Sequence, residues 1–137
     1  MGKPEKTRNG RRWTEARFNS FVKGALRSAR WPPKYRCIQK AYVEDGINPK
    51  TGRRCKLHRC QGCGQTFPKN QIRADHIEPV VPVTGFTNWD DVINRLFVEA
   101  DGFQALCVEC HKSKTKEENA NRKRHEKLAK ELAREAG

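Results

Sequence analysis

The spacing of apolar residues predicts a helix near the start of the chain. Apolar side chains recur every three or four residues after Thr14, which suits an N-cap, at Phe18, Phe21, Val22, Ala25, Leu26 and Ala29. We expect this helix to bury that face and to end at Trp31-Pro32-Pro33, because proline removes a helical hydrogen bond and clashes with the preceding turn. Its other faces are rich in arginine.

The middle of the chain alternates between short predicted strands, short helices and turns. Strands are predicted at residues 53–59, 71–77 and 103–106. Helices are predicted at residues 37–43 and after an N-cap at Thr87 or Asn88, with the apolar face Val92, Ile93, Leu96 and Phe97. Asp45-Gly46 and residues 48–52 are turn signals. Residues 108–136 are charged and favour a helix, so the pattern as a whole predicts an α+β fold.

Composition indicates one small domain that needs a staple. The chain has 137 residues, of which 35% are hydrophobic and 33% charged, so its apolar core must be small. The N-terminus lacks the apolar run of a signal peptide, and no stretch approaches the roughly 20 apolar residues of a membrane span. We therefore expect a cytoplasmic protein without a membrane partner, in which the six cysteines are metal ligands before they are disulfides.

Charge is distributed unevenly along the chain. The net charge is +13, which favours a polyanionic partner, nucleic acid before membrane. Residues 1–36 carry 11 basic and 2 acidic side chains, residues 37–73 carry 8 and 2, residues 74–110 carry 1 and 7, and the remainder carries 9 and 5. An acidic centre between basic flanks suits a phosphate-processing site with a divalent cation. The alternative is that the basic flanks, the first helix included, are only solvated faces.

Two cysteine pairs form the strongest local motif. Cys60-x-x-Cys63 and Cys107-x-x-Cys110 each allow a tight turn to direct two thiolates at one ion, and two such turns complete a tetrahedral Zn²⁺ site. Four thiolates leave no open coordination position, so this zinc is expected to be structural. A redox pair or a chance spacing is the alternative. Cys37 and Cys55 are expected to be free thiols, although Cys55 is a possible substitute ligand.

Three side chains near these pairs suit phosphodiester chemistry. Asp75 and His76 close the predicted strand at residues 71–77, and His111 follows the second cysteine pair directly. A carboxylate with an imidazole suits Mg²⁺, Mn²⁺ or a similar cation, and a neutral imidazole suits a general base near pH 7. Alternatively, His76 is a buried structural histidine and His111 a zinc ligand or helix cap. Because neighbouring strand residues face opposite ways, Asp75 and His76 serve one phosphate only if the strand ends or bulges there.

The order and spacing of these motifs resemble the HNH (ββα-metal) endonucleases, most of all the small free-standing enzymes encoded by phages. The resemblance covers about residues 53–120 and rests on Cys60-x-x-Cys63, Asp75-His76-Ile77-x-Pro79 and Leu106-Cys107-x-x-Cys110-His111-x-x-Lys114-Thr115. It implies a β-ribbon packed on a helix, with a cation between them and the four cysteines on zinc. It also implies that His76 is the general base and that Asp75 and His111 hold the catalytic cation.

One departure from the family pattern concerns its middle asparagine. The family carries this residue about five positions before the second cysteine pair, where this chain has Gly102-Phe103-Gln104-Ala105-Leu106. Asp101, Asn94, Asn119 or Asn121 could take over its work, and the residues do not choose among them. The departure leaves room for slow, altered or lost catalysis.

The resulting expectation is a nuclease that nicks or cuts double-stranded DNA, with weak sequence specificity. Its expected domains are a disordered basic arm (1–12), an N-terminal helical region (13–52), the nuclease domain with its zinc knuckle (53–120) and a charged helical tail (121–137). If phage-encoded, it would act in the host cytoplasm. The alternatives are a non-catalytic zinc-knuckle nucleic-acid-binding protein and an accessory to phage packaging proteins.

Overall fold

The computed structural model describes residues 2–136 and divides the chain into two compact units. One unit extends to Arg30 and the other begins at Trp31, and each is described by itself. The first contains the strand pair β1 (Lys6–Arg8) and β2 (Trp13–Thr14), followed by α1 (Glu15–Arg27). The sequence predicted a disordered arm over residues 1–12, and the structure differs by placing β1 within it.

The first unit is held together by contacts between arginines and their neighbours. Thr14 caps α1 as predicted, its hydroxyl accepting a hydrogen bond from the Arg17 amide at 3.2 Å. The Arg8 guanidinium pairs with Glu15 at 2.9 Å and lies 4.3 Å from the centre of the Phe18 ring. The expected buried face is not found, because α1 has no buried residue and Phe21 is 58% exposed.

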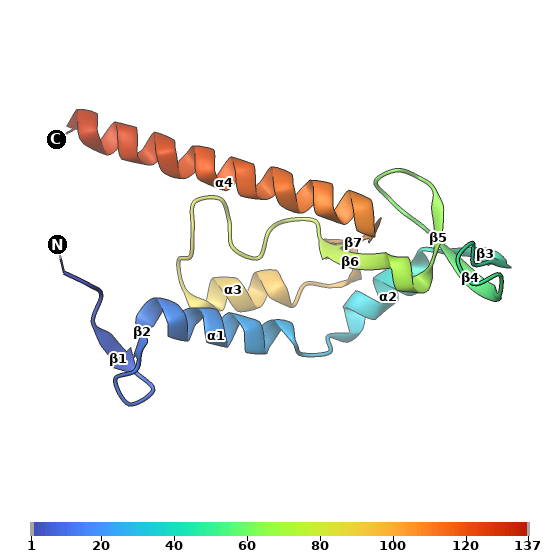
Figure 1. Cartoon of the computed structure of the whole chain (residues 1–137), viewed down its shortest axis with the longest axis horizontal. Coiled ribbons are helices and arrows are strands. Elements are labelled where there is room, and N and C mark those ends of the chain that lie inside the picture. Colours follow the sequence, from blue (N-terminus) through green and yellow to red (C-terminus); the bar gives the residue numbers. More distant parts are fainter. Residues whose placement is uncertain (1, 137) are drawn as a thin grey trace. The chain divides into compact units, whose positions relative to one another are not determined.

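The second unit contains most of the secondary structure (Figure 1). In chain order its elements are α2 (Pro32–Lys40), β3 (Tyr42–Ile47), β4 (Arg54–Arg59), β5 (Thr66–Pro68), η1 (Lys69–Gln71), β6 (Ile72–His76), α3 (Trp89–Leu96), η2 (Ala100–Gly102), β7 (Phe103–Cys107) and α4 (Val108–Ala136). The chain is thus an α+β protein, as predicted. Its strands form a three-stranded sheet, β3-β4-β5, and a separate two-stranded ribbon, β6-β7.

The β6-β7 ribbon organises this unit. It is antiparallel and unbroken by bulges, with Ile72 opposite Cys107, Asp75 opposite Gln104 and His76 opposite Phe103. Side chains alternate between the faces of a strand, so Asp75 leaves one face and His76 the other. Helices α2 and α4 both contact β6 and β7. The small core lies about the ribbon and consists of Cys37, Ile38, Cys60, Ile72, Phe103, Ala105, Leu106 and Cys107.

Two local predictions from the sequence differ from the structure. Helix α1 does end before Trp31-Pro32-Pro33, but the second helix, predicted at residues 37–43, spans Pro32–Lys40, since a proline in the first turn loses no helical hydrogen bond. Asp45 and Gly46, predicted as a turn, lie inside β3. The absence of a side chain suits Gly46 there, because a Cβ at this position would meet the Leu57 side chain on β4.

The predicted N-cap of the third helix is confirmed at Asn88, whose side chain accepts a hydrogen bond from the Asp91 amide at 2.8 Å. Replacing Asn88 by alanine should lower the free energy of unfolding by about 1 kcal/mol, because one amide at the start of α3 loses its partner. Urea unfolding measures this change. Asn94→Ala, an exposed position on the same helix, is the control, and an equal loss there would contradict the capping role.

Candidate metal centres and active site

The four predicted cysteines come together at one point. The sulfur atoms of Cys60, Cys63, Cys107 and Cys110 all lie within 4.8 Å of one another. Tetrahedral zinc with Zn–S bonds of about 2.3 Å requires sulfur atoms about 3.8 Å apart, so a small contraction would complete the site. Cys37 and Cys55 lie outside the group, as predicted. The four cysteines therefore could hold a structural zinc ion.

Backbone amides around this group favour the thiolate form. The Cys60 sulfur accepts from the amides of Gly62 at 3.3 Å, Cys63 at 3.5 Å and Cys107 at 3.2 Å. Burial opposes the charge, but these amides outweigh it and lower the pKa of Cys60 to about 6. The Cys110 thiol donates hydrogen bonds to the Cys107 and Cys60 sulfurs, which raise its pKa to about 12. Zinc binds the thiolate form of cysteine, so a cluster that stabilises a thiolate suits a zinc site.

The cysteine group joins three parts of the unit. Cys60 follows β4 directly, Cys107 ends β7, and Cys110 lies in the first turn of α4. Gln61 reinforces the junction, because its amide donates to the Ala105 carbonyl at 2.8 Å and its side-chain oxygen accepts from the Ala105 amide at 2.6 Å. An ion bound there would fix the start of α4 on the end of the ribbon, and with it the direction of every side chain on the first turns of α4.

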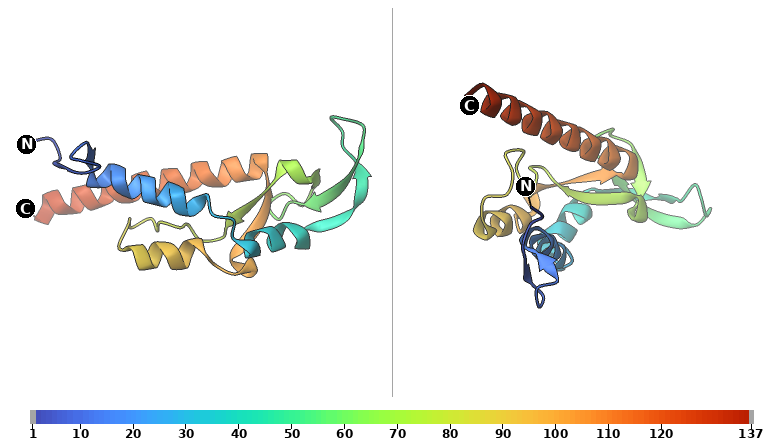
Figure 2. Two further views of the ribbon diagram at one scale, coloured as in Figure 1. Left: turned by 90° about the horizontal axis from the view of Figure 1, so that it is seen from below. Right: turned by 60° about the vertical axis from the view of Figure 1, so that its left-hand side comes forward.

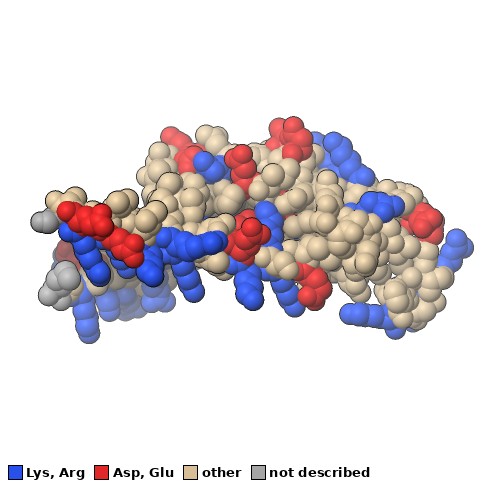
Figure 3. Space-filling model, turned by 90° about the horizontal axis from the view of Figure 1, so that it is seen from above, with Lys and Arg blue, Asp and Glu red and all other residues tan. Residues whose placement is uncertain are grey.

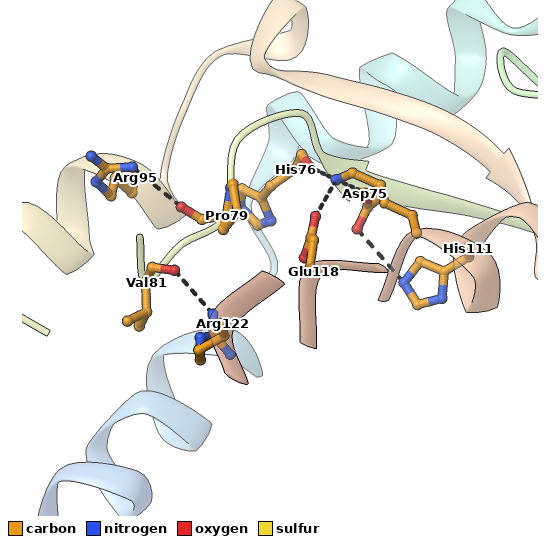
Figure 4. A network of polar contacts seen from close by, with 9 residues as sticks. Asp75, His76, Pro79, Val81, Arg95, His111, Glu118 and Arg122 are labelled. Carbon is orange, nitrogen blue, oxygen red and sulfur yellow. Dashed lines mark hydrogen bonds and ion pairs between the residues drawn. The ribbon is translucent and has the colours of Figure 1, made fainter. Parts of the chain in front are cut away.

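Asp75 faces α4, where it meets His111 and Lys114. The His111 Nε2 atom lies 3.6 Å from Asp75 Oδ1. The Lys114 ammonium donates to Asp75 Oδ2 and to the His76 carbonyl, and pairs with Glu118 Oε1 at 2.9 Å. Figure 4 shows Asp75, Glu118 and His111 near one another, with a dashed line between Asp75 and His111. Burial disfavours the Lys114 charge, but the bonds to Asp75 and Glu118 outweigh it and raise its pKa.

In this cluster the carboxylates of Asp75 and Glu118 surround the positive charge of Lys114. Two ligands of one Mg²⁺ or Mn²⁺, each about 2.1 Å from the ion, lie about 3.0 Å apart when adjacent. The Asp75–His111 separation of 3.6 Å is close to that value. The residues therefore fit a cation on Asp75 and His111. Among the described residues, however, only the four cysteines bring three or more such ligand atoms within reach of one ion. A cation here would complete its coordination with water or phosphate oxygens.

His76 lies on the other face of the ribbon from Asp75. Its ring packs 4.6 Å from the Phe103 ring, and its Nε2 atom lies 2.8 Å from the Leu96 carbonyl oxygen. A carbonyl only accepts, so Nε2 carries the proton and, in the neutral ring, Nδ1 keeps its lone pair. No bulge turns the two side chains to the same face, and they share Lys114 only through the His76 carbonyl at the strand end.

The segment after His76 is tied down from two sides. Arg95 on α3 pairs with Asp91 at 3.1 Å and donates to the Pro79 carbonyl at 3.4 Å. Arg122 on α4 donates to the Val81 carbonyl at 3.1 Å (Figure 4). Loop 77–88 is thus fastened beside the end of β6, which limits the directions in which the His76 ring can turn.

Sequence reasoning missed the parts played by Glu118 and Arg122. Glu118 lies seven residues after His111 and four after Lys114, which places all three on one side of a helix, and Arg122 continues the series by four. That spacing was available in the sequence. The contacts were not, because they depend on how α4 lies across β6.

The four candidates for the missing asparagine do not converge on the Asp75 cluster. Asp101 and Asn94 line a hollow with Ile77, Glu78 and Arg95, on the α3 side of the ribbon. Asn119 lines a shallow surface on α4 with His111 and Lys123. Asn121 accepts from Arg124 on the exposed part of α4. Asp101 and Asn94 thus lie on the face of the ribbon that carries His76, and Asn119 lies on the helix that carries His111.

Comparisons with known proteins identify no relative. No protein-family model matches the chain, and no curated protein or solved structure is similar to it. None of the described helices is long and apolar enough to cross a membrane.

Proposed function

We propose that this chain is a cation-dependent DNA endonuclease of the HNH (ββα-metal) type, stapled by zinc on Cys60, Cys63, Cys107 and Cys110. The observation that carries the proposal is the placement of Asp75, on β6, against His111, on the first turn of α4. The order strand β6, strand β7, helix α4 agrees with the ββα arrangement, and the cysteine group joins the last two.

In this proposal each residue has a defined part in hydrolysis. Asp75 and His111 hold the cation, which supplies charge stabilisation at the phosphate and at the leaving oxygen. Strand β6 ends at His76, so the proposal requires the phosphate to lie at the strand end, where the Leu96 carbonyl holds the His76 ring and leaves Nδ1 to accept a proton from water. The water oxygen would then bond to phosphorus as the P–O bond to the leaving oxygen breaks. With a cation on Asp75, Lys114 would keep Glu118 as its partner.

A zinc-stapled DNA-binding protein without activity is the second candidate. Two observations favour it: Asp75 already has Lys114 as a partner, and the His76 ring leaves the opposite face of the ribbon. In that case Asp75–Lys114 is a structural ion pair and His76 a hydrogen-bonded packing residue. The two proposals differ in whether phosphodiester bonds are broken.

The test is Mn²⁺-dependent nicking of supercoiled plasmid by the wild type and by Asp75→Asn. Losing the carboxylate charge should weaken cation binding, so we expect the Mn²⁺ concentration for half-maximal nicking to rise by about tenfold or more. Glu117→Gln, an exposed position on α4, removes the same charge and is the control. Nicking with the same Mn²⁺ dependence in all three proteins would exclude Asp75 as a cation ligand.

A further inference from the structure

We propose that the β3-β4 ribbon, residues 42–59, is a second DNA-contacting element that lies in the major groove of duplex DNA. The inference rests on the proposed function in taking duplex DNA as the partner. It concerns binding, however, and not the chemistry at Asp75 and His76. Two views in Figure 2 show this ribbon extending away from the rest of its unit.

The ribbon carries an excess of positive charge towards its tip. Residues 46–57 contain Lys50, Arg53, Arg54 and Lys56, all exposed, and no acidic residue. The two acidic residues of the ribbon, Glu44 and Asp45, lie just before this stretch, and Asp45 is opposite Lys56. Within residues 2–136, Lys50, Arg53 and Arg54 have no ion-pair partner, whereas Arg8 and Arg95 each have one. Figure 3 shows Lys and Arg side chains, with acidic side chains beside them, projecting from the part of the second unit that contains β3 and β4. Several basic side chains without ion-pair partners, close together on one ribbon, suit contacts with successive phosphates of a DNA backbone.

Exposed apolar groups accompany these charges. Ile47 is 57% exposed and lies opposite Arg54 across the ribbon, so the two side chains share a face. Pro49 is exposed in the connecting loop. In a groove, apolar side chains contact thymine methyl groups while arginines reach phosphates and base edges.

The connecting loop is held in one conformation before any partner binds. The Asn48 amide donates to the Arg53 carbonyl at 2.8 Å, and the Gly52 amide donates to the Asn48 carbonyl at 2.8 Å. The Asn48 side chain accepts from the Lys50 amide at 2.9 Å. Gly52 has a φ of +70°, a conformation that suits glycine. A loop fixed in advance lowers the entropy lost on binding.

The dimensions of the ribbon fit the major groove. Strand β5 pairs only with Leu57, His58 and Arg59, so the ribbon is two-stranded from the pair Asp45 and Lys56 to its tip. The major groove of B-form DNA is about 12 Å wide and admits a two-stranded ribbon. The free part of the ribbon therefore offers two strands and a basic tip to the duplex.

The test compares two triple variants in equilibrium binding to a short duplex, without added divalent cation so that no cleavage occurs. Lys50→Gln/Arg53→Gln/Arg54→Gln removes three charges from the ribbon. Lys127→Gln/Lys130→Gln/Arg134→Gln removes three exposed charges from α4 and is the matched control. We expect the ribbon variant to bind at least tenfold more weakly and its log K against log salt slope to fall by about 2–3. The control should change little.

Three results would overturn the proposal. The first is that the ribbon variant binds the duplex as tightly as the wild type, and the second is that both variants lose the same affinity. The third, from the same titration with a single-stranded RNA, is that the ribbon variant loses affinity for the RNA and not for the duplex. Guanine N7 methylation, which blocks the major groove, should weaken wild-type binding more than it weakens binding by the ribbon variant, and equal sensitivity would place the ribbon elsewhere. Zinc content and urea midpoint check that both variants fold. If the wild type never nicks plasmid but the ribbon variant still loses affinity, the endonuclease proposal fails and this one stands.

Discussion

Replacing His76 by alanine should lower the rate of plasmid nicking by about 10²–10⁴-fold, the usual contribution of a positioned general base. The reason is the geometry at the end of β6, where the Leu96 carbonyl accepts a hydrogen bond from Nε2–H and leaves Nδ1 as the one basic nitrogen of the neutral ring. Because the loss is in proton transfer, affinity for DNA and zinc content should stay close to those of the wild type.

Alanine at this position also removes packing against Phe103 and a hydrogen bond to Leu96, so a second variant is required. His76→Gln keeps an N–H group that can donate to the Leu96 carbonyl but offers no basic nitrogen, and should be as inactive as His76→Ala. His125→Ala, on the exposed part of α4, is the histidine control and should nick at the wild-type rate. Full activity in His76→Gln would remove His76 from the chemistry.

Removing zinc should unfold the unit that begins at Trp31. Cys60 and Cys107 are both part of the small core, and their cluster joins β4, β7 and α4, so losing the ion affects packing and connectivity together. Structural zinc contributes about 10 kcal/mol or more in small zinc-stapled peptides, which is as much as a whole domain has to lose. Excess chelator should therefore abolish the cooperative unfolding transition in circular dichroism, and Cys107→Ala should do the same without chelator.

The matched control is Cys55→Ser, which alters a half-buried cysteine outside the cluster. It should bind one zinc per chain and keep its transition. The pKa of Cys60, lowered from 9.0 to about 6, gives this thiolate a stabilising effect that is complete above the ordinary thiol pKa and is lost as pH falls through about 6. Acid should therefore release the zinc. If the zinc-free chain kept its cooperative unfolding transition, zinc would not be a structural part of the fold.

The parts of the structure that the sequence predicted best are those set by local chemistry. The spacing of Cys60, Cys63, Cys107 and Cys110 was sufficient to predict their cluster, because a two-residue gap permits only a tight turn. The Asn88 cap followed from a polar residue directly before an apolar helical face. The long helix α4 followed from a run of helix-favouring residues.

The parts that the sequence did not predict depend on tertiary context. The pair Asp45-Gly46 is typical of a turn, yet the Leu57 side chain of the neighbouring strand occupies the space that a larger residue at position 46 would need. The Lys114 bonds to Asp75 and to the His76 carbonyl depend on the angle at which α4 crosses the ribbon. Since α4 is positioned by contacts far apart in the sequence, residue spacing alone could not give that angle.

The most direct measurement of the central claim is the conversion of supercoiled plasmid by the wild-type, zinc-loaded protein with Mg²⁺, with Mn²⁺ and without either ion. The account predicts nicked or linear plasmid only where the cation is present. Binding without conversion in every divalent ion tested would contradict it, and would leave Asp75, His76 and His111 as structural residues of a zinc-stapled DNA-binding protein.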